Sequence, residues 1–318
     1  MRIVFLGTPA FSVPFLRALV RPGERAPYRL VGVVTQPDRP GGRGRKPKPS
    51  AVKVEAEKLD LPTLQPERLR NNPLALEFLA RTKPDLLIVV AFGQLLPTEF
   101  LNYPPLGALN IHTSLLPRYR GAAPVVHALM NGETETGVTL MKLDKGMDSG
   151  DIVSQLRIPI GEEVTTGEVE DILSEPGVEL MLRDILPYSR GDLSPTPQNP
   201  AEATFAPRIE KKHARIEWNR SGTAIHNLIR ALNPRPTAFA HFRDKGVKIW
   251  RSQRIAEQSA QTNRTSGEIC EVTPDSILVQ CGDDTQLALK ELQLENRKRL
   301  SARDFANGLA LKAGERFY

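Results

Sequence analysis

The chain has 318 residues, of which 40% are hydrophobic and 25% are charged, a composition typical of a globular protein with room for two domains. Its net charge of +6 and pI near 9.4 permit a polyanionic partner without requiring one. Cys270 and Cys281, the two cysteines, form no C-x-x-C pair, which excludes a cysteine zinc site and a disulfide framework. The longest apolar run, residues 86–92, is too short to cross a bilayer, and we expect a cytoplasmic monomer.

The first part of the chain predicts an α/β fold with a Rossmann-like, mostly parallel sheet. Residues 2–6, RIVFL, are an apolar run ending at Gly7 and predict a buried strand. Residues 11–19 predict the first helix, and residues 30–35 predict the second strand. The pattern G-x-G-x-x-G does not follow the first strand, which argues against a dinucleotide cofactor.

Residues 36–49, QPDRPGGRGRKPKP, contain four prolines, three glycines and five cations. No periodic pattern runs through them, so they predict an exposed loop. The P-loop pattern G-x-x-x-x-G-K-[ST] does not fit this loop. Two interpretations stay open: a solvated charged loop, or a loop in which Arg43, Arg45, Lys46 and Lys48 bind phosphates.

The middle of the chain continues the α/β pattern. Ser50 is placed to cap a helix over residues 50–59, and residues 85–92, DLLIVVAF, predict the central strand. Leu95 and Leu96 in the next turn either wall a slot for a flat ring or belong to the core. The remaining predicted elements are helices at 73–82, 124–130 and 166–186, the last kinked or broken at Pro176 and Gly177, and strands at 136–141 and 151–160, the latter antiparallel at the sheet edge.

The last third predicts a second domain. Residues 191–207 contain four prolines and few apolar residues, which predicts a linker between domains at 1–190 and 208–318. Short strand-like runs separated by turns predict a small β-barrel, and they lie at 237–242, 247–250, 267–272, 276–280 and 286–289. Helices are predicted at 222–232 and 302–309.

The candidate site lies in residues 108–124, ALNIHTSLLPRYRGAAP. Asn110 and His112 occupy alternate positions at the end of a buried strand, so they point to the same face. A second strand, residues 137–141, leads into the carboxylate-rich and glycine-rich turn at 143–152, LDKGMDSGDI. An amide, an imidazole and a carboxylate at strand ends are a plausible set for acyl transfer. The alternative is a structural Asn–His pair.

These motifs carry a resemblance to a known family. The pattern N-x-H-x-S-L-L-P-x-x-x-G-A-A-P, followed by D-x-G-x-D-x-G-D, resembles the folate-dependent formyltransferases, most of all those acting on initiator tRNA. The segments FLGTPAF at 5–11, TQPDRP at 35–40 and RIEW at 215–218 also resemble that family. The resemblance covers essentially the whole chain, although Arg235 stands where the family commonly has Trp.

The resemblance implies transfer of a formyl group from 10-formyltetrahydrofolate, a donor substrate, to the α-amine of methionyl-initiator-tRNA for translation initiation, without a metal. The matched spacing selects Asp148 rather than Asp144 or Asp151. For this reaction we assign Asp148 as base and orienter, His112 as oxyanion and leaving-group partner, and Asn110 as oxyanion donor.

The resemblance also implies binding residues. The expected folate contacts are Phe92, Leu95, Ser114, Leu115, Leu116 and Pro117. The expected tRNA contacts are Arg43, Arg45 and Lys46, together with an OB-like barrel at 208–318. Two alternatives remain: a formyltransferase acting on a small amine, such as glycinamide ribonucleotide or an amino-sugar nucleotide, and an RNA-binding protein with an inactive transferase domain.

Overall fold

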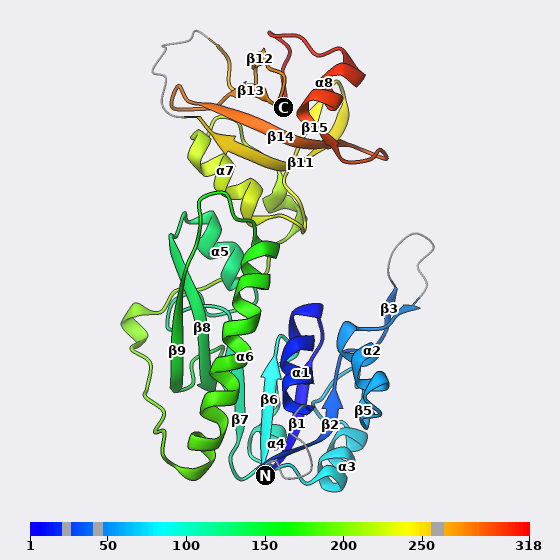
Figure 1. The fold of residues 1–318 in the computed structure, drawn as a ribbon, viewed down its shortest axis with the longest axis vertical. Helices are drawn as coiled ribbons and strands as arrows, with labels where there is room; N and C mark the ends of the chain where they lie inside the picture. The colour runs from blue at the N-terminus through cyan, green and yellow to red at the C-terminus, as the bar shows by residue number, and fades with distance from the viewer. Residues whose placement is uncertain (21–26, 41–46, 256–263) are drawn as a thin grey trace. The chain divides into compact units, whose positions relative to one another are not determined.

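The computed structural model describes residues 1–20, 27–40, 47–255 and 264–318 (Figure 1). The chain divides into two compact units. Unit 1 consists of Met1–Pro124, Glu135–Pro159 and Glu170–Ala206. Unit 2 consists of Val125–Thr134, Ile160–Val169 and Pro207–Tyr318. Unit 2 is therefore assembled from three stretches that are separated in the sequence.

Unit 1 is built on a seven-stranded sheet with the strand order β5-β2-β1-β6-β7-β8-β9. Its parallel part consists of β1 (Arg2–Gly7), β2 (Arg29–Val34), β5 (Thr63–Leu64), β6 (Leu86–Val90) and β7 (Ala108–His112). Two antiparallel strands, β8 (Glu135–Lys142) and β9 (Ile152–Pro159), complete one edge. Every residue of β6 and β7 is buried, which explains the continuous apolar sequence of β6.

Helices cover this sheet. Val4 and Leu6 of β1 pack with Phe78 and Leu79 of α3 in one buried cluster, while α1 and α6 lie together in front of the sheet in Figure 1. Ser50 caps its helix as predicted, because its Oγ accepts a hydrogen bond from the Lys53 N–H at 3.0 Å. The helices of unit 1 are α1 (Val13–Val20), α2 (Ala51–Lys58), α3 (Pro73–Thr82), α4 (Thr98–Leu101) and, from Glu170 on, α6 (Thr166–Arg190), with short 3-10 turns at Ala10–Ser12 and Pro200–Glu202. Helix α5 (Pro124–Met130) belongs to unit 2 from Val125 on.

The sequence predicts a kink or a break of α6 at Pro176 and Gly177, and the helix is not broken there. The helix runs from Thr166 to Arg190 with Pro176 inside it. A proline in a helix interior costs about 3 kcal/mol, but burial of Leu173, Leu180 and Met181 along α6 offsets that cost. Gly177 has a packing role, since a Cβ there would lie 2.9 Å from the Phe15 ring of α1.

The segment predicted as one continuous exposed loop, 36–49, contains secondary structure at its ends. β3 (Arg39–Pro40) pairs antiparallel with β4 (Pro47–Lys48). Asp38 fixes the base of this hairpin, because its carboxylate accepts hydrogen bonds from Lys53 Nζ at 2.8 Å and Gln65 Nε2 at 2.8 Å. Both bonds lower the pKa of the Asp38 carboxyl, and the bond from Lys53 has the larger effect. The prolines and glycines of this segment indicate a loop, so the sequence did not predict these two short strands.

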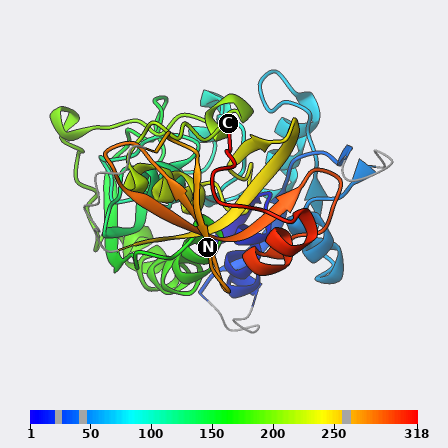
Figure 2. The same ribbon diagram turned by 90° about the horizontal axis from the view of Figure 1, so that it is seen from above.

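Unit 2 is a curled antiparallel sheet with the order β10-β11-β14-β13-β12, to which β15 adds beside β14. Helix α8 lies along β14 in Figure 2. The C-terminal residues join the two edge strands: Tyr318 and His241 exchange backbone hydrogen bonds, and Phe317 N donates to Gly267 O at 2.8 Å. The elements are α7 (Gly222–Ala231), β10 (Phe239–Phe242), β11 (Lys245–Arg254), β12 (Ile269–Val272), β13 (Ile277–Gln280), β14 (Gln286–Leu294), β15 (Leu300–Ser301) and α8 (Ala302–Leu309), with a 3-10 turn at Lys211–Ala214. The predicted fold class, a Rossmann-like domain followed by a small barrel-like one, is confirmed.

A buried histidine in unit 2 gives a stability prediction. His226 is 2% exposed, with Nδ1 3.0 Å from Ser252 Oγ and Nε2 3.1 Å from Glu162 O. Burial lowers the pKa of His226 below its ordinary value of 6.5. The unfolded chain therefore binds a proton that the folded chain does not, so the free energy of unfolding is expected to fall as the pH drops below that value. Urea unfolding between about pH 7.5 and about pH 5 checks this. His226→Gln should lose less stability over that range, and equal losses would contradict the assignment.

Candidate active site

Two polar side chains emerge at the end of β7. The strand pairs parallel with β6 and antiparallel with β8, placing Asn110 opposite Met141 and His112 opposite Thr139. Asn110 is only 9% exposed, and no hydrogen bond joins its side chain to another residue in the described parts of the chain. A nearly buried amide without a protein partner is free to donate to a ligand.

His112 is oriented by a backbone carbonyl. Its Nε2 lies 2.9 Å from the Tyr119 oxygen, and a carbonyl only accepts, so Nε2 carries a hydrogen. The other ring nitrogen, Nδ1, lies 3.7 Å from Asp148 Oδ2. The ring nitrogen that is not bonded to the Tyr119 carbonyl therefore faces the carboxylate, and the structure brings His112 and Asp148 together.

Asp148 is held by the same loop as His112. Its Oδ2 accepts a hydrogen bond from the Gly121 N–H at 2.8 Å, and its backbone is left-handed, with φ 48°. Gly121 has φ 124°, and a Cβ there would lie 2.7 Å from the Ala206 oxygen, so only glycine fits. Asp144 instead accepts bonds within its own turn, from Gly146 N and Ser149 Oγ.

The predicted folate contacts differ in how much surface they present. Phe92 and Leu116 are buried, Ser114 is fully buried with its hydroxyl donating to Arg118 O at 2.7 Å, and Leu95 is 78% exposed. Leu115 and Pro117 are half-buried. The main chain of residues 114–117 is fixed to β8, because Leu116 N donates to Thr139 Oγ1 at 3.2 Å. The folate assignments stay predictions.

The predicted tRNA contacts Arg43, Arg45 and Lys46 lie outside the described residues. Of the cations in that loop, Arg39 and Lys48 are described, and both are exposed. They sit opposite one another in the β3–β4 pair. A phosphate-binding role for this loop stays a prediction.

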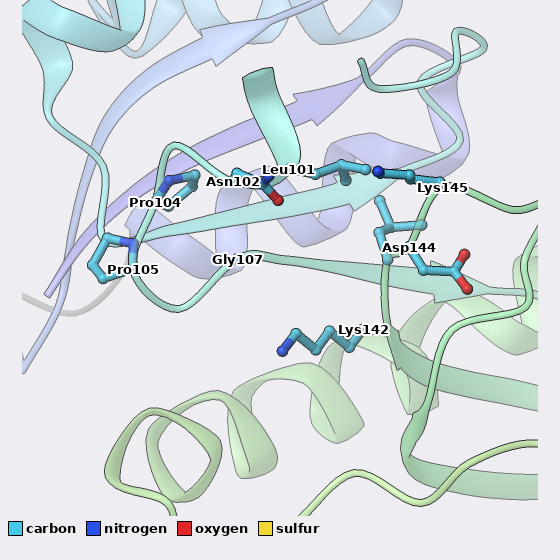
Figure 3. A pocket seen from close by; sticks show the side chains of 9 residues that line it. Leu101, Asn102, Pro104, Pro105, Gly107, Lys142, Asp144 and Lys145 are labelled. Atoms are coloured by element: carbon cyan, nitrogen blue, oxygen red, sulfur yellow. The ribbon is translucent and has the colours of Figure 1, made fainter. Parts of the chain in front are cut away.

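A pocket of about 530 Å³ lies at the other end of β7 (Figure 3). Gly107, just before β7, and Lys142 and Asp144, at the end of β8, are among its lining residues. Figure 3 shows the Lys142 and Lys145 side chains at its rim together with Pro104 and Pro105. None of the predicted catalytic or folate-binding residues lines this pocket, so it is separate from the candidate site.

Two residues of the site, Gln198 and Arg120, were not assigned from the sequence. Gln198 lies in the proline-rich segment 191–207, and its Nε2 donates to Asp148 O at 2.9 Å and Gly150 O at 2.7 Å. Its Oε1 accepts from the Arg120 guanidinium at 2.7 Å and 3.0 Å. Because these partners are 48 or more positions away in the sequence, no local pattern indicates the contact.

No three His, Cys, Asp or Glu side chains gather as a metal site would need within residues 1–20, 27–40, 47–255 and 264–318. In the same ranges, every helix is too short or too polar to cross a membrane.

Comparison with known proteins identifies the class. Residues 1–185 match the formyl transferase family model, and residues 208–310 match the model of the formyl transferase C-terminal domain. The chain therefore belongs to the formyltransferase family.

Its relatives include methionyl-tRNA formyltransferases. The chain is 43% identical to the one of Halalkalibacterium halodurans over 97% of its own length and 95% of the relative's. It is 44% identical to the one of Citrifermentans bemidjiense over 99% and 95%. Among solved structures, WlaRD, a sugar 3N-formyl transferase crystallised in the presence of dTDP and 5-N-formyl-THF, matches with TM-score 0.67 at 19% identity. That match covers 94% of this chain and 99% of WlaRD and shows a shared fold.

Proposed function

We propose that this chain transfers the formyl group of 10-formyltetrahydrofolate to the α-amine of methionyl-initiator-tRNA in the cytoplasm, where translation begins. The observation that carries the chemistry is the cluster at the end of β7: the Asn110 amide, which has no hydrogen-bond partner among the described residues, and His112 Nδ1, which lies 3.7 Å from Asp148 Oδ2. Identity above 40% to methionyl-tRNA formyltransferases over nearly the whole chain supports this acceptor.

The residues of the cluster match the steps of formyl transfer. The neutral amine attacks the formyl carbon, and the resulting oxyanion accepts hydrogen bonds from the Asn110 amide and the His112 Nδ1–H. Asp148 accepts the proton that the amine loses. The bond from the formyl carbon to folate N10 then breaks, N10 takes the Nδ1 proton of His112, and the proton on Asp148 passes to His112 Nδ1, so that both side chains return to their starting states. The pKa of a free α-amine is about 8, so a substantial fraction of the amine is already neutral near neutral pH and can attack.

The donor is proposed to bind beside this cluster. Ser114, Leu115, Leu116 and Pro117 form the lip after β7, and Phe92 and Leu95 flank the turn after β6. Leu95 offers the exposed apolar surface that a pterin ring can cover. The fixed main chain of the lip, rather than the Ser114 hydroxyl, is then available to the ligand, because that hydroxyl already donates to Arg118 O.

The tRNA is proposed to contact the loop carrying Arg43, Arg45 and Lys46, and the domain at 208–318. The division into a formyltransferase domain at 1–190, a linker at 191–207 and a tRNA-binding domain at 208–318 is supported by the two family matches. Unit 2 also carries a suitable surface, where Lys248 and Arg299 lie 5.9 Å and 4.8 Å from the Trp250 ring. Cations around an aromatic ring are typical of nucleic-acid binding. The enzyme is proposed to act as a monomer.

Assays with three acceptors test this function. With 10-formyltetrahydrofolate as donor, methionyl-tRNA should be formylated, while glycinamide ribonucleotide and an amino-sugar nucleotide should not. Release of formylmethionine after tRNA hydrolysis measures the product. Formylation of a small amine in preference to the tRNA would favour the alternative acceptor class and leave the chemistry of Asn110, His112 and Asp148 in place.

A further inference from the structure

We propose that Gln198 is a positioning residue for formyl transfer, which ties the turn carrying Asp148 to Arg120 and thereby sets the distance between Asp148 and His112. The proposal rests on the role of Asp148 proposed above. It gives a function to the segment 191–207 beyond that of joining two domains.

Both the nitrogen and the oxygen of the Gln198 side-chain amide form hydrogen bonds. Its Nε2 donates to the carbonyl oxygens of Asp148 and Gly150, at 2.9 Å and 2.7 Å. Its Oε1 accepts from Arg120 Nε and Nη2, at 3.0 Å and 2.7 Å. Since carbonyls only accept and a guanidinium only donates, just one orientation of the amide satisfies all four bonds. Gln198 is therefore a cross-link between two loops with a fixed geometry.

Arg120 is a firm anchor for this cross-link. It is 8% exposed, and its backbone pairs with the same segment that carries Gln198: Arg120 N donates to Thr204 O at 2.8 Å, and Ala206 N donates to Arg120 O at 2.7 Å. The neighbouring Tyr119 N donates to Thr204 Oγ1 at 2.8 Å. Tyr119 and Arg120 are thus held to residues 204–206 by two main-chain bonds and one bond to the Thr204 hydroxyl.

Both catalytic side chains depend on this one anchored loop. Tyr119 O orients His112, and the Gly121 N–H holds the Asp148 carboxylate. The main chain of Asp148, in a left-handed conformation that costs energy in an L-residue, is held from the other side by Gln198. Without Gln198 the 148–150 turn keeps the Gly121 bond but loses its tie to Arg120, so the 3.7 Å separation from His112 is no longer fixed.

Gln198→Ala is the direct test. We expect kcat to fall roughly ten- to a hundredfold, because a displacement of about 1 Å in a catalytic group costs about that much, with KM for both substrates unchanged within about twofold. Asn199→Ala is the matched control, since among the described residues the Asn199 amide donates to Glu202 Oε1 and accepts from Ala201 N, both in its own segment. It should keep the kcat of the parent. Equal kcat in parent and Gln198→Ala would overturn the proposal.

A conservative variant separates the two roles of Gln198, its bonds to Asp148 and Gly150 and its bond to Arg120. Gln198→Glu keeps an acceptor for Arg120 but sets a carboxylate oxygen against two carbonyl oxygens, which repel it. It should lower kcat at least as far as Gln198→Ala, at an unchanged thermal midpoint. Restoration of the parent kcat by Gln198→Glu would show that the bonds to Asp148 and Gly150 do not matter.

A double-mutant cycle separates this proposal from the proposed role of Asp148. Asp148→Asn keeps an oxygen for the Gly121 N–H and removes the charge. In that background Gln198→Ala should add little further loss, because it acts through Asp148. A full additional loss would contradict positioning. If Asp148→Asn itself leaves kcat unchanged, the role of Asp148 fails and this proposal with it; if Asp148→Asn lowers kcat and Gln198→Ala does not, only the positioning fails.

Discussion

Replacing Asn110 by alanine is expected to lower kcat for formyl transfer about a hundred- to a thousandfold, the usual loss when one oxyanion donor is removed. The side chain is nearly buried and makes no hydrogen bond within the described residues, so its removal leaves no protein partner unpaired. Stability should therefore change little, and the loss should fall on the transition state rather than on substrate binding. Single-turnover rates at saturating donor and tRNA measure it.

Two variants sharpen this measurement. Asn110→Asp keeps the shape but replaces the donor by an acceptor, so it should be at least as slow as the alanine variant. Asn102→Ala removes an amide at the pocket in Figure 3, at the other end of β7, and should match the parent. An Asn110→Ala enzyme with a normal kcat and a raised KM for the donor would instead place Asn110 in folate binding.

His112→Ala is expected to lower kcat about a hundred- to ten-thousandfold, the range for loss of a positioned acid–base group. The donor should still bind, because the lip at 114–117 is held by bonds from β8 rather than by His112. His127→Ala is a matched control, since His127 Nε2 also lies 2.9 Å from a carbonyl, that of Pro207, and no catalytic role is assigned to it.

Tritium- or fluorescence-based binding of the folate donor, measured beside the rate, separates the two effects. A large loss of donor affinity with normal turnover at saturation would overturn the acid–base assignment for His112. Combining His112→Ala with Asp148→Asn should cost little more than His112→Ala alone, because the two side chains act in one proton relay from the amine to folate N10.

The strands of unit 1, and the placement of Asn110 and His112 on one face of their strand, could be predicted because both depend on local periodicity. Alternation along a strand places both side chains on one face whatever the rest of the chain does. The proximity of Asp148 needed more, since it depends on the antiparallel pairing of β8 with β7. It was predicted from a carboxylate-rich turn after a strand and from family spacing.

The parts that were missed depend on main-chain atoms and distant segments. Tyr119 O and Gly121 N orient the catalytic side chains, and main-chain groups carry no residue-specific signal. Gln198 lies in a segment whose prolines indicate only that no regular element forms there. The uninterrupted α6 was missed because the cost of Pro176 is visible in the sequence, whereas the burial that offsets it is a property of the packed helix.

The composite make-up of unit 2 has a consequence for recombination between relatives. A crossover in the proline-rich segment 191–207 would exchange everything after it, yet Glu162 and Glu168 of unit 2 lie before it. These carboxylates pair with Arg254 and Arg251. A hybrid gene would take each acid from one parent and its arginine from the other. The two halves are therefore expected to be inherited together, with a substitution at 168 or 162 accompanied by one at 251 or 254.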